Sequence, residues 1–143
     1  MPKLKKKSKP SFVFDTYVLL ALLYKETPYQ SVVDYLTQAA AHEITLLFNE
    51  INVGELYYRV WKDQGKEMAE KALLIISQLP LTYVAIDRAF ILAAATWKAQ
   101  YPISYADAFA AQTAYMFKCP LITNDPEFDA VSGIKIIKLG LTI

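Results

Sequence analysis

The sequence of 143 residues contains only one histidine, one cysteine and four glycines. A single histidine, His42, argues against a Ser-His-Asp triad, a multi-histidine zinc site and a Cys-His pair. A single cysteine, Cys119, excludes an intrachain disulfide and favours a reducing compartment, so we expect a cytoplasmic protein. The few glycines form neither G-x-G-x-x-G nor a Walker-type loop, which leaves dinucleotide and P-loop nucleotide binding without support.

Long apolar runs are also missing, because the apolar run 17–24 stops at Lys25, far short of the about 18 residues that a membrane helix needs. Hydrophobic residues nevertheless make up 55% of the chain, enough for the core of one domain. We expect that domain over residues 11–143 and a basic, flexible arm over residues 1–10. The arm carries five lysines, which leaves the rest of the chain mildly acidic, and it is either a solvated tail or a phosphate-binding segment.

Short apolar segments alternate along the chain with longer segments that carry apolar residues at helical spacing. The segments with strand character are residues 12–15, 44–48, 81–86, 120–123 and 134–139. Those with helical character are residues 16–25, 28–41, 49–64, 66–78, 87–100 and 104–118. This alternation indicates β-α-β units, so we expect the α/β class: a three-layer α/β/α sandwich with a mainly parallel central sheet.

Acidic residues stand where the expected strands end. Asp15 follows FVF and Asp125 follows PLITN, while Glu55 lies about two turns into helix 49–64 and Asp107 lies in the first turn of helix 104–118. Ligands of open α/β sheets bind in the crevice at the carboxyl ends of the strands. All four carboxylates could therefore reach one crevice.

Helix capping is the competing explanation for three of these acids. Asp125 precedes a proline, Ser104 and Asp107 have capping-box spacing, and Asp15 stands at the start of a helix. Capping does not explain Glu55, which lies too deep in its helix. Glu50 is a rival to Glu55, but the two are about 140° apart around the helix and Glu50 falls at the helix start, so Glu55 is the better candidate.

Four carboxylates that meet without basic partners repel one another and raise their own pKa values. Mg²⁺ or Mn²⁺ would resolve that conflict, since both ions prefer oxygen ligands. We therefore interpret Asp15, inside the apolar stretch FVFDTYVLLALL, as a metal ligand, with a helix cap or an ion pair as alternatives. Metal-dependent hydrolysis of phosphodiesters needs no histidine.

With these acids in place, the sequence resembles a PIN domain and is most similar to the prokaryotic VapC-type toxins. The resemblance covers nearly the whole chain and is most specific in residues 102–128. There an acid opens a small-residue helix, an apolar strand follows, and Thr-Asn-Asp with a downstream Phe closes the segment. FVFDTYVLL around Asp15 is a good further match and NVGELYY around Glu55 a looser one.

The resemblance implies a Mg²⁺- or Mn²⁺-dependent endoribonuclease, the toxin of a type II toxin–antitoxin pair. It places Asp15, Glu55, Asp107 and Asp125 around the metal. It also implies an RNA substrate, a small VapB-like antitoxin as partner, and a homodimer.

Threonines beside two of the acids have an implied supporting role. Thr123 matches the family's hydroxyl position and would hold a carboxylate or a water, and Thr16 would do the same beside Asp15. Tyr17 departs from the small polar residue that the family commonly has after Asp-Thr. Arg59, one turn beyond Glu55, is a candidate for an RNA phosphate, with an ion pair to Glu55 or a neighbouring acid as the alternative.

Two other functions are compatible with these residues. The first is a catalytically silent PIN-like module that binds RNA or a protein, to which Tyr17 and the lysine arm point. The second is a phosphatase or DNA nuclease that uses the same metal chemistry.

Overall fold

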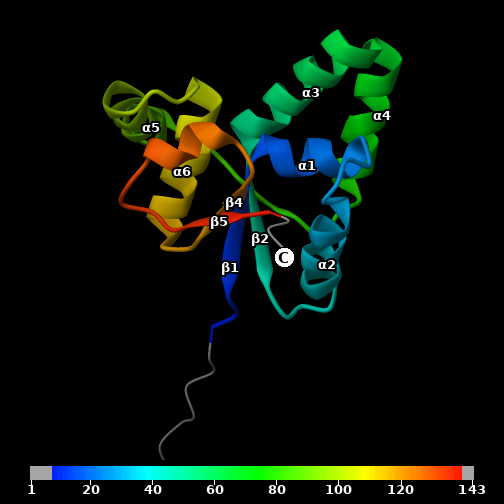
Figure 1. Cartoon of the computed structure of the whole chain (residues 1–143), viewed down its shortest axis with the longest axis horizontal. Coiled ribbons are helices and arrows are strands. Elements are labelled where there is room, and N and C mark those ends of the chain that lie inside the picture. The colour runs from blue at the N-terminus through cyan, green and yellow to red at the C-terminus, as the bar shows by residue number, and fades with distance from the viewer. Residues whose placement is uncertain (1–7, 140–143) are drawn as a thin grey trace, which may run out of the picture.

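A five-stranded parallel sheet forms the centre of the protein, whose computed structural model describes residues 8–139 (Figure 1). The strands are β1 (Ser11–Phe14), β2 (Thr45–Asn49), β3 (Thr82–Val84), β4 (Leu121–Thr123) and β5 (Ile136–Lys138). They lie in the order β3-β2-β1-β4-β5, and every neighbouring pair is parallel. The strands can be this apolar because helices cover both faces of the sheet.

Six α-helices and one 3₁₀ helix connect the described strands. They are α1 (Thr16–Leu23), α2 (Tyr29–Ala40), α3 (Glu50–Gln64), α4 (Lys66–Ser77), α5 (Arg88–Gln100), α6 (Tyr105–Phe117) and the 3₁₀ helix η1 (Pro126–Ala130). In Figure 1, α5 and α6 lie on one side of the sheet and α1 to α4 on the other. The expected three-layer α/β/α sandwich is thereby confirmed.

The central strand distributes its side chains to two separate apolar cores. In β1, Val13 packs in the core under α5 and α6, whereas its neighbour Phe14 packs in the core under α1 to α4. Leu121 and Ile122 of β4 divide between the two cores in the same way. Successive side chains of a strand point to opposite faces, so an uninterrupted apolar strand supplies both cores at once.

The strand order reverses direction beside β1. The chain adds β2 and then β3 on one side of β1, returns through α5 and α6, and adds β4 and β5 on the other side. The boundary between β1 and β4 is therefore a topological switch point, where the connections leave in opposite directions and open a crevice at the carboxyl edge of the sheet.

The expected elements are present in the described residues, with ends that differ by a few positions. The third and fifth strands differ most, since β3 and β5 each cover three of the six residues expected in 81–86 and 134–139. The 3₁₀ helix η1 lies between the fourth and fifth strands, where no helix was expected. Residues 1–7 of the expected arm lie outside the described part of the chain. No described helix is long and apolar enough to cross a membrane.

Asn49 joins the sheet to two helices and generates a stability prediction. Its amide nitrogen donates to Thr113 Oγ1 (3.0 Å), both side chains are fully buried, and its Oδ1 accepts from the Ile51 N–H (2.9 Å) as the N-cap of α3. We expect Asn49→Ala to lower the free energy of unfolding by about 2 kcal/mol, because it removes a cap and a buried hydrogen bond. Urea denaturation measures this, and a loss below about 0.5 kcal/mol would contradict the assigned role.

Candidate metal centre

Asp15 lies at the switch point, directly after β1, and is almost fully buried at 1% exposure. It is the N-cap of α1, where its Oδ1 accepts from the Val18 N–H (3.1 Å). Its Oδ2 accepts a short hydrogen bond from the hydroxyl of Thr123, the last residue of the adjacent strand β4. One oxygen therefore caps a helix while the other faces the end of the neighbouring strand.

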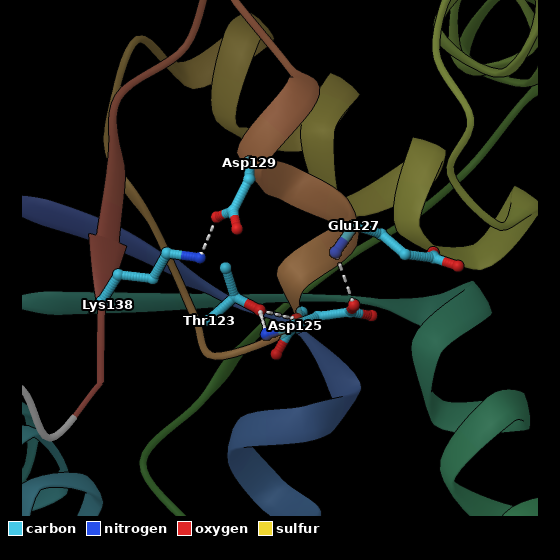
Figure 2. A network of polar contacts seen from close by, with 6 residues as sticks. Thr123, Asp125, Glu127, Asp129 and Lys138 are labelled. Atoms are coloured by element: carbon cyan, nitrogen blue, oxygen red, sulfur yellow. Dashed lines mark hydrogen bonds and ion pairs between the residues drawn. The ribbon is translucent and has the colours of Figure 1, made fainter.

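Two further acids follow β4: Asp125 lies between β4 and η1, and Glu127 lies in η1, as Figure 2 shows. The Asp125 N–H donates to Thr123 Oγ1 (2.9 Å), and Asp125 Oδ1 accepts from the Glu127 N–H (2.9 Å) as the N-cap of η1. The expected cap followed by a proline is thus present. The hydroxyl of Thr123 links Asp15 to Asp125, because it donates to one and accepts from the backbone of the other.

Asp107 reaches the crevice from the first turn of α6, opposite η1. Its N–H donates to the side chain of the N-cap Ser104 (3.1 Å). In a capping box the acid three residues after the cap would return a bond to the cap's own N–H, but Glu127 Oε2 accepts the Ser104 N–H instead (3.1 Å). The carboxylate of Asp107 is thereby left for other contacts.

Three carboxylates form the tightest acidic group that the described residues contain. Oxygens of Asp107, Asp125 and Glu127 all lie within 4.8 Å of one another. Asp107 and Asp125 were predicted from the sequence as ligands, whereas Glu127 was not. The available signal was weak: an acid two residues after a predicted cap, with nothing to show that it would contact residue 104.

Glu55 extends the acidic region from α3. Its side chain is buried (9% exposure), and its charge contributes to raising the pKa of Asp15, as does the charge of Asp125. Asp15 in turn contributes to raising the pKa of Asp107. Glu55, Asp107 and Asp125 therefore each lie within electrostatic reach of Asp15. The rival Glu50 is exposed at the first position of α3.

Burial and like charge together disfavour the ionised form of Asp15 and Asp107. Burial raises the pKa of Asp15 to about 7 against the opposing hydrogen bonds from Thr123 and Val18, and the charges of Asp125 and Glu55 raise it further. The pKa of Asp107 also lies far above its usual range, first because of burial and then because of contacts with Glu127 and Asp125. Ionisation of Asp15 and Asp107 is therefore energetically costly in the folded protein.

Within the part of the chain that the structure describes, no lysine or arginine forms an ion pair with Asp15, Glu55, Asp107, Asp125 or Glu127. The ion pairs there join Lys71 to Glu67 and Lys138 to Asp129, which is the pair drawn in Figure 2. Arg59 is exposed. Burial raises the pKa of Tyr24, and the charge of Arg59 opposes that rise. The suggested contact of Arg59 with an RNA phosphate stays a prediction.

Two further polar residues hold the helices around the crevice. Thr16 donates from its hydroxyl to the main-chain oxygen of Asn52 in α3 (3.4 Å), so in this structure it contacts a helix and not a carboxylate. The fully buried Asn52 donates to the main-chain oxygen of Ala106 in α6 (3.3 Å), and its Oδ1 has no partner among the described residues. The sequence analysis missed Asn52, although a polar residue one turn before Glu55 shares its side of the helix.

The donor set fits a hard divalent cation. Every candidate ligand atom is an oxygen, as a hard cation prefers. Asp107, Asp125 and Glu127 take part in none of the described ion pairs. The raised pKa of Asp107 shows that its ionised form is costly in the folded protein, and a bound cation would lower that cost. The group of Asp107, Asp125 and Glu127 could therefore hold a metal ion.

The sequence model of the PIN domain family matches residues 12–134, which contain every acid described above. The chain belongs to the PIN domain family. No curated protein matches this PIN domain.

Several solved structures share the fold of this PIN domain. DNA-bound VapBC from Salmonella typhimurium has a TM-score of 0.71 and 20% identity over 90% of this chain and 98% of that chain. VapBC2 from Rickettsia felis, bound to a promoter DNA fragment, has a TM-score of 0.70 and 19% identity over the same shares. VapC20 from Mycobacterium tuberculosis, a sarcin–ricin loop cleaving toxin, has a TM-score of 0.68 and 15% identity over 87% of this chain and 97% of that chain.

The raised pKa of Asp107 predicts how stability depends on pH in the absence of metal. The unfolded chain loses this proton near the ordinary value of 3.8, whereas the folded chain keeps it to a higher pH. The folded state then binds more protons, so its stability falls as pH rises above about 4. In EDTA, we expect Asp107→Asn to be more stable than the native protein, by a margin that grows between about pH 5 and about pH 8. A margin independent of pH in urea denaturation would contradict this account.

Binding of a divalent cation should offset the loss of stability that ionised Asp107 causes. With Mn²⁺ at about 100 times its Kd, we expect the Tm of the native PIN domain to rise by about 5 °C or more, because the ion binds only the folded state. Asp107→Asn should lose most of this rise, whereas the matched control Glu50→Gln, at an exposed acid, should keep it. Equal shifts in the two variants would remove Asp107 from the metal site.

Proposed function

We propose that this PIN domain is a Mg²⁺- or Mn²⁺-dependent endoribonuclease that hydrolyses RNA phosphodiester bonds with Asp15, Glu55, Asp107 and Asp125. The observation that carries the proposal is the meeting of acidic side chains at the switch point of the sheet, where Asp15 and Asp107 are buried, Asp125 is half-buried and Glu127 is exposed. Ligand sites of open α/β sheets lie at this point. An all-oxygen site with no nearby histidine suits hydrolysis that depends on metal and not on a side-chain nucleophile.

Hydrogen bonds fix the direction of the carboxylates of Asp15, Asp125 and Glu127. Asp107, Asp125 and Glu127 would hold the ion, with Asp15 and Glu55 beside them, and a bound divalent ion supplies polarisation of the phosphate and a water of lowered pKa. Thr123 fixes Asp15 by its hydroxyl, and the Ser104 N–H fixes one oxygen of Glu127, which leaves the other oxygen free. Burial of Asp15, Glu55 and Asp107 reduces the screening of their charges by water.

The toxin role is part of the proposal. VapC20, which shares the fold, is described as a sarcin–ricin loop cleaving toxin, and another similar structure is a toxin–antitoxin complex from Klebsiella pneumoniae. We propose that this chain is likewise the toxin of a type II pair and acts on RNA in the cytoplasm, as a homodimer.

A small antitoxin would be its partner. A small hollow of about 60 Å³ between the end of α1 and helices α3 and α4 supports this part of the proposal, since its lining includes Leu23, Met68 and Ile75 beside Gln64 and Lys71. Met68 and Ile75 are exposed, at 41% and 45%. Exposed apolar side chains on neighbouring helices suit contact with the apolar face of an amphipathic segment.

Removal of one ligand tests the activity. We expect Asp107→Asn to lower Mn²⁺-dependent cleavage of RNA by more than about 100-fold, beyond the loss typical of a residue that merely supports a ligand. Circular dichroism should remain native. The readout is the rate of cleavage of labelled RNA, with duplex DNA and a phosphomonoester in parallel to detect a DNA nuclease or a phosphatase.

Glu50→Gln is the matched control, because it removes one exposed acid from the same edge of the sheet, and it should cleave at the native rate. Full cleavage by Asp107→Asn would defeat the assignment. If the native protein binds RNA equally well in EDTA and turns over no substrate with any divalent ion, it is a silent binding module. Tyr17, exposed beside Asp15 and Thr16, is the residue that favours this second function.

A further inference from the structure

A basic surface lies at the amino edge of the sheet. The acidic residues Asp15, Glu55, Asp107, Asp125 and Glu127, together called the acidic centre, lie at the opposite edge. The basic surface consists of two adjoining cavities of about 520 Å³ and about 470 Å³ that share Lys118, Cys119 and Pro120. Lys135, just before β5, lines the first cavity, and Lys9, just before β1, lines the second. Figure 1 shows β1 entering the sheet at the end opposite the one from which α1 leaves.

The charge of the basic surface has one sign. Its lining residues include Lys9, Lys118 and Lys135 and no aspartate or glutamate. None of the three lysines takes part in an ion pair within residues 8–139. Residues 10–143 as a whole carry ten basic and fourteen acidic side chains, a net charge of −4. The charge of the basic surface is therefore opposite in sign to the net charge of the domain.

Aromatic side chains border the lysines. Tyr115 and Phe117 of α6 line these cavities and are 58% and 47% exposed. The ring of Tyr115 packs against Trp97 in a T-shaped arrangement, with 5.8 Å between the ring centroids, and this contact restrains it. Lysines that contact a phosphate backbone, beside aromatic rings that stack on bases, are the combination by which proteins bind single-stranded nucleic acid.

Helix α6 connects the basic surface to the acidic centre. Asp107 lies in its first turn and Lys118 caps its last, so the two ends are separated by about 20 Å along thirteen residues. The carbonyl groups at the end of α6 carry partial negative charge, so attraction of a phosphate there depends on the lysine ammonium groups. One strand of RNA could contact both ends of this helix.

We propose that the basic surface binds a single-stranded segment of the RNA, away from the bond that is cleaved. The proposal rests on the nuclease function and adds a second contact to it: the acidic centre acts on one phosphodiester, while Lys9, Lys118 and Lys135 hold a distant part of the strand. The exposed rings favour RNA over an anionic lipid surface, for which stacking has no use.

The test measures RNA affinity in EDTA, where no cleavage occurs, by fluorescence anisotropy of a labelled oligouridine of about 16 nucleotides. We expect the full-length variant Lys9→Gln/Lys118→Gln/Lys135→Gln to bind at least about tenfold more weakly. The slope of log K against log salt should fall by about 2, since each phosphate contact contributes about 0.7. The control Lys25→Gln/Lys62→Gln/Lys98→Gln makes the same change of charge at exposed lysines outside both cavities.

Equal affinity of the two triple variants for the oligouridine would overturn the proposal. Binding of phosphatidylserine vesicles through Lys9, Lys118 and Lys135, without loss of RNA affinity in the same variant, would also overturn it in favour of a membrane surface. Mn²⁺-dependent cleavage is measured separately. The proposed function fails if the native protein does not cleave, whereas the basic surface fails if its variant still binds RNA normally.

Discussion

Repulsion between carboxylates at the carboxyl edge of the sheet is the constraint around which this PIN domain is arranged. Asp15 and Asp125 stand at the ends of adjacent parallel strands, and α6 adds Asp107 from the facing side. Burial would ordinarily drive such acids apart or neutralise them. The fold instead keeps them together through donors that belong to its helix starts, among them the N–H groups of Val18 and Glu127.

Helices that directly follow a parallel strand begin at the carboxyl edge of the sheet, as α1, α3, α5 and η1 do. The N-termini of α1 and η1 follow β1 and β4 there, and the partial positive charge of a helix start offsets part of the negative charge nearby. The same directionality places the end of α6, with Lys118, at the opposite edge. One topology therefore separates acids from lysines along the strand direction.

The fold and most of the acidic centre followed from sequence because they depend on local patterns. Apolar strands, helical spacing and acids after strands identified the sandwich and brought Asp15, Asp107 and Asp125 to one edge. Glu127 was missed because its importance depends on the Ser104 N–H, and nothing in either segment indicates that η1 packs beside the start of α6. Asn52 was missed for the same reason: its partners lie in α1 and α6, so only the assembled tertiary structure shows that it joins three helices.

Capping and metal binding were treated as competing explanations of these acids, but the structure shows that one carboxylate can serve both. A cap uses one oxygen of a carboxylate, so Asp15 and Asp125 each keep a second oxygen for another contact. Asp107 is the case in which the two uses would conflict, since a capping box would turn its side chain back to Ser104. Glu127 removes that conflict because it satisfies the Ser104 N–H from another element. A glutamate from η1 thus completes the cap of α6, and the shorter aspartate remains directed at the other acids.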